Sequence, residues 1–365
     1  MPPCSIAVLL AGIAIRYVPH AMALIAVAHV IAGASHPFWP VAWLFLGAPL
    51  VESLLGEESG PRSGRGHAAR LASRLAPWLW VPVQASLFVA GLSIAREAFD
   101  PVTAAITAVP TGMMSGIFGM AAAHELMHRR GVARSVAALM LASWGYGHFL
   151  IEHVHGHHRR VGTFADPATA RLGENLYVFL PRTLKGTWVD AWHLETIRLA
   201  RHGRRVCCPQ NRLIVLGVLS IALCVAACLV AGLPGAVFFV VHGAVVVSIL
   251  ETVNYVQHYG LERRSVRDPI AAHHTWNCTS RLTNLLLFDL GRHADHHLAS
   301  TLQAFDRDPP SDAPRLPSGY FTMFVVALLP PLWTQIMDPR ATLVRKRVAC
   351  GLTPLPARNL GKGVP

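Results

Sequence analysis

Four groups of histidines in this chain have the types and spacing that bind metal ions. They lie in HELMHRR (124–130), EHVHGHH (152–158), NYVQHYG (254–260) and GRHADHH (291–297). Histidines three or four positions apart project from one face of a helix, so each cluster can present its imidazoles together. HExxH alone is the zinc-protease pattern, but one zinc ion takes only about four ligands. The set therefore predicts two metal ions, of a type that imidazole alone does not name. The predicted ligands are His124, His128, His153, His157, His158, His258, His293, His296 and His297.

Residues beside these histidines are candidates to orient them, because a metal-bound imidazole usually donates its other ring N–H to an acceptor. The candidates are Glu125, Glu152, Asp166, Asn254 and Asp295. A helix cap or a loop salt bridge is an equal alternative for Asp166. Supporting or structural roles are expected for His148, His155, His273 and His274, and structural roles for His20, His29, His36, His67 and His242.

The composition indicates an integral membrane protein. Of the 365 residues, 53% are hydrophobic and 14% are charged, against about 25% charged in soluble domains. The net charge of +12 comes mainly from arginines in loops between apolar runs, which is typical of membrane proteins and argues against nucleic-acid binding.

Six apolar runs approach the length of about 20 residues that crosses a bilayer. They cover 17–35, 37–55, 76–96, 103–123, 213–232 and 235–253. Arg and Lys concentrate in the loops around 56–75 and 156–212, and the positive-inside rule places these loops in the cytoplasm. The pattern predicts an all-α protein of the inner membrane. Its six transmembrane helices form three hairpins, with both termini and a helical cap carrying the histidines on the cytoplasmic side.

The remaining segments complete the predicted organisation as a single domain over 1–365. Runs at 135–151 and 318–337 are predicted as helices at the membrane interface, the second broken by Pro330–Pro331. Residues 1–15 are interpreted as an uncleaved N-terminal extension, and 341–365 as a flexible C-terminal tail.

The sequence contains no motif that would supply electrons to a redox metal. Its seven cysteines show no CxxC spacing, and no flavin or nicotinamide fingerprint occurs. A separate protein must deliver electrons if the metals are redox-active. Arg159, Arg160, Arg204 and Arg205 are candidates to steer an acidic partner.

The four histidine motifs, with the longer stretches 152–174 and 273–297 around two of them, resemble the integral-membrane alkane 1-monooxygenases of the fatty-acid-desaturase-like group. The likeness begins near PLVESLLGE (49–57) and weakens over the first 40 and last 25 residues. It implies six spans and a non-haem di-iron centre on the cytoplasmic side. The family's nine ligands match the nine histidines named above. It also implies rubredoxin or a ferredoxin-type donor, with its NAD(P)H reductase, and oxygen insertion into the terminal methyl group of an alkane that dissolves in membrane lipid.

Gln257 departs from the family pattern, where a glutamate usually precedes the histidine of NYxEHYG. HELMHRR, Gln257 and PPLW (330–333) are similar to the xylene-type monooxygenases, which hydroxylate alkyl-aromatic methyl groups. Alkane and alkyl-arene substrates therefore both stay open. A lipid desaturase on the same di-iron architecture, a membrane zinc protease with Glu125 as base, and a non-enzymatic metal transporter are further alternatives.

Overall fold

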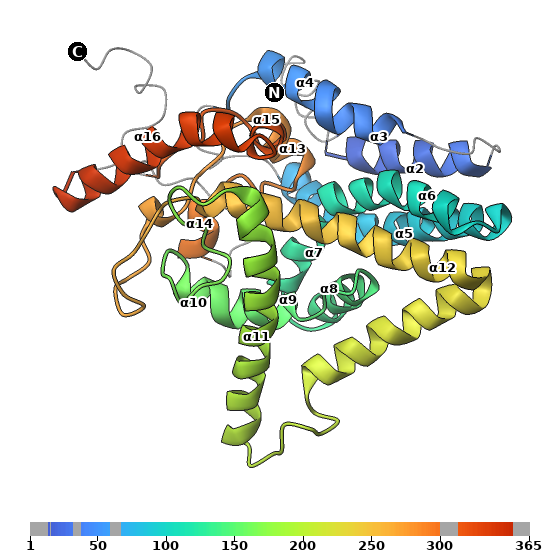
Figure 1. The fold of residues 1–365 in the computed structure, drawn as a ribbon. Coiled ribbons are helices and arrows are strands. Elements are labelled where there is room, and N and C mark those ends of the chain that lie inside the picture. Colours follow the sequence, from blue (N-terminus) through green and yellow to red (C-terminus); the bar gives the residue numbers. More distant parts are fainter. Residues whose placement is uncertain (1–13, 15, 32–37, 59–66, 300–312, 353–365) are drawn as a thin grey trace.

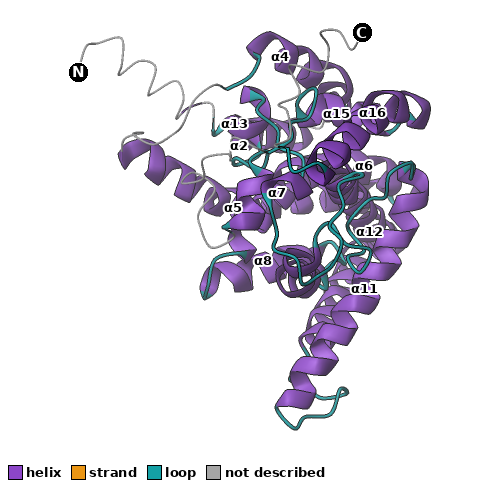
Figure 2. Ribbon diagram, turned by 90° about the vertical axis from the view of Figure 1, so that its left-hand side faces the viewer, coloured by secondary structure: helices purple, strands orange, loops and turns teal. Residues whose placement is uncertain are grey.

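The computed structural model describes residues 14, 16–31, 38–58, 67–299 and 313–352, and this part of the chain is built from helices (Figures 1 and 2). Two isolated bridges, Glu57 with Ser280 and Asn277 with Arg315, are its extended pairings. The helices are α2 (Val18–Ile31), α3 (Trp39–Ala42), η1 (Trp43–Gly47), α4 (Ala48–Leu55), α5 (His67–Ala98), α6 (Pro101–Met114), η2 (Ser115–Gly119), α7 (Met120–Met127), α8 (Val132–Ser143), α9 (Phe149–Glu152), η3 (His153–His157), α10 (His158–Arg160), α11 (Leu176–Arg201), α12 (Arg212–His258), η4 (Ala272–His274), α13 (Arg281–Leu286), α14 (His293–Leu298), α15 (Tyr320–Ala327) and α16 (Pro330–Ala349). The all-α prediction is confirmed.

Three of these helical segments are long and apolar enough to cross a membrane, which indicates an integral membrane protein. They are α5, the continuous run α6–η2–α7 over Pro101–Met127, and α12. The α15–α16 pair makes a fourth if its two helices, bent by 120°, count as one broken span. The runs predicted at 17–35 and 37–55 correspond to shorter apolar helices.

The turn predicted around 232–235 divides α12 into two arms. Gly232 has φ 65° and ψ −156°, a conformation that side chains with a Cβ rarely adopt, and Pro234 follows it. The arms separate from this point like the sides of a V (Figure 1). A Cβ at Gly235 would lie 2.1 Å from the Ala227 carbonyl oxygen, so only glycine permits the two arms to meet this closely.

Local signals explain where the elements that carry the site begin and end. Asp100 caps α6 by accepting a 2.7 Å hydrogen bond from the Thr103 N–H. The α6–η2–α7 run ends at its histidines, just before Gly131, whose φ is 68°. Its middle turn, η2, is a π-helical turn, a feature that often marks functional sites.

Several predicted boundaries differ from the structure. The helix predicted over 135–151 ends at Ser143, because Gly145 with φ 71° turns the chain before α9 begins. The tail predicted from residue 341 starts inside α16, which continues to Ala349 with Ala341 and Val344 buried. Residues 353–365, and all of the predicted N-terminal extension except residue 14, lie outside the described residues, as does His36.

Candidate metal centre

Four separate helical segments bring the nine predicted histidines into one cluster. The end of α7 supplies His124 and His128, η3 and α10 supply His153, His157 and His158, the end of α12 supplies His258, and α14 supplies the last three. Rings from distant segments are close neighbours: the His124 and His296 centroids lie 4.5 Å apart, and those of His157 and His258 lie 4.6 Å apart.

The ring nitrogens form two groups, each with its ligand atoms within 4.8 Å of one another. The first group is His124, His128, His153 and His296. The second group is His157, His258, His293 and His297.

His158 lies between the two groups. Its Nε2 is 3.1 Å from His153 Nε2 in the first group. Its ring centroid is 4.6 Å from that of His296 and also 4.6 Å from that of His297, which belongs to the second group. One side chain therefore faces both groups.

The spacing of the nitrogens fits metal coordination. His293 Nε2 lies 3.0 Å from His258 Nε2 and 3.0 Å from His297 Nε2, although a neutral imidazole nitrogen cannot hydrogen-bond two others of its own kind with a single proton. Two imidazole nitrogens bound about 2.1 Å from one ion and at right angles to each other would lie about 3.0 Å apart. The distances are those of ligands that share an ion.

Burial prepares these imidazoles to bind a cation. Removal from water, and then the neighbouring imidazoles, hold the pKa of His153, His293 and His297 well below the usual value of 6.5. The rings are therefore neutral near pH 7, as a metal ligand must be. An all-imidazole donor set suits zinc, copper, iron or nickel.

Asp166 is placed to orient one of the second group's histidines. Its Oδ2 accepts 2.8 Å and 2.6 Å hydrogen bonds from His157 Nδ1 and Thr169 Oγ1, and its Oδ1 accepts from the Ala168 N–H at 3.1 Å. With its proton fixed on Nδ1, His157 presents a bare Nε2 to the group. Asp166 also caps its own loop through Ala168, so both roles considered from the sequence occur together.

The other four candidates occupy different surroundings. Glu125 accepts a 3.2 Å hydrogen bond from Arg129, and Asn254 donates at 3.3 Å to Glu251. Glu152 is fully buried, 3.8 Å from Arg160 Nη2, and burial, followed by Asp166 and Asp190, raises its pKa well above the usual value. Asp295 lies in the first turn of α14, between ligand candidates.

Two buried carboxylates that the sequence analysis passed over organise the surroundings of the cluster. Glu251 on α12 accepts hydrogen bonds from Tyr146 Oη at 2.6 Å and Thr183 Oγ1 at 3.0 Å. Glu52 accepts from Ser280 and Thr283 at 2.9 and 2.6 Å, and from Thr322 on α15. An acidic residue inside an otherwise apolar run is costly to bury and could have been singled out on that ground alone.

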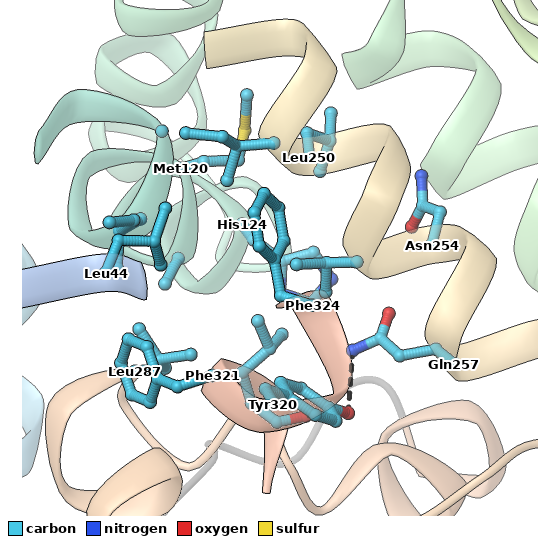
Figure 3. A pocket seen from close by; sticks show the side chains of 16 residues that line it. Leu44, Met120, His124, Leu250, Asn254, Gln257, Leu287, Tyr320, Phe321 and Phe324 are labelled. Carbon is cyan, nitrogen blue, oxygen red and sulfur yellow. Dashed lines mark hydrogen bonds between the residues drawn. The ribbon is translucent and has the colours of Figure 1, made fainter. Parts of the chain in front are cut away.

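A narrow apolar cavity of about 40 Å³ opens beside His124, between η2–α7, the second arm of α12, and α15 (Figure 3). Its wall is formed largely by Leu44, Ile117, Met120, Leu250, Phe321 and Phe324. Gln257 is a polar exception, and its amide donates a 2.9 Å hydrogen bond to Tyr320 Oη. At the level of Gly116, about two helical turns from His124, α12 comes close: a Cβ there would meet Ile249 Cδ1 at 2.9 Å.

Comparison with known proteins places these features in a family. Residues 101–307, which include all nine histidines, match the fatty acid desaturase family. Alkane 1-monooxygenase 1 of Pseudomonas aeruginosa is 36% identical over 329 residues, covering 84% of each chain. Alkane 1-monooxygenase 2 of Alcanivorax borkumensis is 36% identical over 269 residues, covering 72% of this chain and 69% of that protein.

An aromatic-substrate relative also aligns. The xylene/toluene monooxygenase hydroxylase component of Pseudomonas putida is 30% identical over 264 residues, covering 71% of each chain. Two imidazole clusters at the end of apolar helices, and similarity that extends over most of the chain, lead to the same assignment. This chain belongs to the fatty acid desaturase family, among its alkane 1-monooxygenase relatives.

Proposed function

We propose that the protein is a di-iron membrane monooxygenase that hydroxylates the terminal methyl group of alkanes. The observation that carries this proposal is the apolar cavity that ends at His124, a member of the first histidine group. A C–H bond of an alkane offers no acid, base or electrophilic carbon to attack, so the reaction needs a redox metal and dioxygen. The balanced change converts R–H, dioxygen, two electrons and two protons into R–OH and water.

The nine histidines are the proposed ligands of two iron ions, which would supply the dioxygen chemistry when bound. The supporting features are the two groups of converging nitrogens and the placement of His158 between them. The protein's own contribution is to hold neutral imidazoles in place, to fix the tautomer of His157 through Asp166, and to exclude water from the substrate.

The cavity favours a thin, apolar substrate. Its volume of about 40 Å³ suits an extended hydrocarbon chain. Each methylene buried there contributes about 0.8 kcal/mol, which lets the cavity bind a molecule with no polar group. The alkane relatives also match more of this chain than the xylene-type relative does.

A xylene-type activity on alkyl-arene methyl groups is the second candidate. Gln257, the residue that departs from the alkane pattern, forms part of the cavity wall and holds Tyr320. Aromatic side chains at 320, 321 and 324 offer ring faces to an arene. The family assignment and the joint placement of nine histidines leave the zinc-protease and transporter alternatives without support. A desaturase differs from a hydroxylase only in its product.

The proposed topology has six spans in three hairpins, in the inner membrane. The two arms of α12 would form one hairpin, α5 with α6–η2–α7 a second, and α2 with α3–η1–α4 the first. His128 ends one span and His258 ends another, so these ligands can share one membrane side. Arginine-rich loops favour the cytoplasm for that side and for both termini. Rubredoxin or a ferredoxin-type protein, with its NAD(P)H reductase, is the proposed electron donor.

The test uses the full chain in membranes with iron, purified rubredoxin, its reductase and NADH, and supplies octane, hexadecane and p-xylene in parallel. Formation of 1-octanol, with two irons per chain, is the expected result. His293→Ala should abolish the product, whereas His193→Ala, on an exposed position of α11, should not. A product with a new double bond, or no oxygenated product from iron-loaded protein, would contradict the proposal.

A further inference from the structure

A second, much larger hollow lies on the outer side of the histidine cluster. This groove of about 770 Å³ is bounded by residues 163–165, by the loop 261–274 that follows α12, and by the last turns of α16. Its walls include Phe164, Glu262, Arg264, His274 and Arg345. We call it the outer groove.

We propose that the outer groove is the docking site of a small acidic electron-carrier protein whose redox centre lies near its own surface. The inference rests on the proposed function, because a monooxygenase that lacks its own flavin or iron–sulfur motif must receive electrons from outside. A nicotinamide cannot take this role directly, since it transfers a hydride, whereas metal ions accept electrons singly.

The outer groove is separated from the candidate metal centre by one layer of side chains. Ala165 lines the groove, and the next residue, Asp166, accepts the 2.8 Å hydrogen bond from His157 of the second histidine group. The route continues through Thr169, which bonds both Asp166 and the Gly162 N–H. A carrier seated here would have a short, hydrogen-bonded path to a metal ligand.

The floor of the outer groove is held rigidly against the segment that carries the ligands. Arg263 is buried and donates to the Arg159 and Val161 carbonyl oxygens at 2.6 and 3.0 Å, and to the Asp268 carbonyl oxygen at 2.6 Å. Its N–H also donates to the Gly162 carbonyl oxygen at 2.6 Å. The loop after α12 and the turn after α10 therefore form one preformed surface, which lowers the ordering cost of binding.

The surroundings of the outer groove are basic and carry an aromatic anchor. Arg264, Arg267, Lys346 and Arg159 are exposed in or beside it, whereas the acidic Glu262 is neutralised by Arg345 at 2.9 Å. Phe164 is 70% exposed, with the Arg171 guanidinium 5.4 Å from its ring centroid. An exposed aromatic ring among positive charges is typical of an interface that recognises an acidic protein.

The other arginines considered from the sequence are placed less well for electron delivery. Arg160 is paired with Asp190 and packs beside buried Glu152. Arg204 and Arg205 lie in the loop after α11, a helix of 26 residues and so about 39 Å long. Its first turn adjoins the cluster side, where the Gly173 N–H donates to Tyr259, and its far end projects away from the remaining helices (Figure 2).

These positions give matched variants for a test. Arg264→Glu and Arg204→Glu make the same charge reversal at exposed loop positions, one in the outer groove and one remote from it. The full-length, iron-loaded protein in lipid nanodiscs is mixed with reduced rubredoxin as the acidic probe, without any hydrocarbon. Reduction of the metal centre is followed by stopped-flow absorbance over a range of rubredoxin and salt concentrations.

Arg264→Glu should weaken the apparent affinity for rubredoxin about tenfold and flatten its salt dependence, and Phe164→Ala should weaken it several-fold. Arg204→Glu should behave as wild type, and reduction by dithionite should be unchanged in all four proteins, which shows that their metal centres are intact. Equal effects of Arg204→Glu and Arg264→Glu, or no effect of either groove variant, would overturn the proposal. Failure of wild type to hydroxylate any hydrocarbon, although rubredoxin reduces it, would instead refute the proposed function.

Discussion

Replacing Asp166 by Asn tests how strongly one carboxylate holds the second histidine group together. Asp166 accepts hydrogen bonds from His157, Thr169 and the Ala168 N–H, so all its described partners donate. An Asn side chain has one oxygen and one NH₂ group, and its NH₂ must face a donor whichever way the amide is turned. His157 then loses either its orientation or its fixed tautomer.

The expected cost appears in metal affinity. Removing an acceptor that orients a metal-bound histidine typically weakens binding about 10- to 100-fold, or about 1.4–2.7 kcal/mol. Because His157 belongs to the second group only, the loss should fall on one of the two ions. The Asp166→Asn protein should therefore pass through a state with one iron per chain as chelator concentration rises.

The assay measures iron per chain by mass spectrometry after equilibration with a graded series of chelator concentrations. Asp190→Asn is the matched control, because Asp190 is a nearby carboxylate that binds Arg160. If Asp166→Asn retains both ions with wild-type affinity, or loses both together at low chelator, the assignment of His157 to a separate metal position is refuted.

Three further changes probe the cavity and the scaffold. Ile249→Ala removes Cγ1, Cγ2 and Cδ1 at the cavity end remote from His124, so the longest alkane hydroxylated should gain about two to three carbons, measured by product chromatography. Tyr320→Phe leaves the Gln257 amide without the phenol and should cost about 1–3 kcal/mol, measured by thermal unfolding in detergent. Glu195→Gln should lower the melting temperature by several degrees at pH 7, with the difference from wild type shrinking as the pH falls towards 2.

The pH dependence of Glu195 follows from its pKa. Burial acts to raise this pKa, but hydrogen bonds from Arg198 and Arg212 outweigh it and hold the value at about 2. The usual value for an unfolded chain is about 4.3, so the stabilisation is present above that pH and disappears as the pH falls through the folded pKa. A constant difference between the two proteins from pH 7 to pH 2 would contradict this account.

Controls separate the other two predictions from general damage. Val245→Ala removes a side chain that packs against Gly112 outside the cavity, and it should leave the chain-length range unchanged. If it extends the range as Ile249→Ala does, the cavity end is wrongly placed. For Tyr320→Phe, unchanged unfolding would show that water replaces the phenol and that the hydrogen bond contributes nothing.

Local sequence signals anticipated the parts of this protein that depend on neighbouring residues. Helical spacing placed His124 with His128, and Gly232 with Pro234 marked the hairpin turn of α12. Alternation of apolar runs and basic loops indicated a helical membrane protein. In each case the determining interactions lie within a few residues along the chain.

What the sequence could not show depends on contacts between distant segments. His153 and His157 lie one turn apart yet join different groups, because η3 is a π-helical turn that changes their relative directions. His296 likewise faces away from the group of its neighbour His297. The roles of Glu52 and Glu251 arise from hydroxyl groups that approach from helices far along the chain.

The five residues of η3 have a consequence for how iron would be acquired. Since this single rigid turn carries one ligand candidate of each group, an ion arriving at either position would immobilise the backbone on which the other position depends. The second ion would then meet a ligand whose ordering has already been completed, so it would bind more tightly than the first. Loading should be cooperative, and half-filled molecules should be scarce in a population supplied with too little metal.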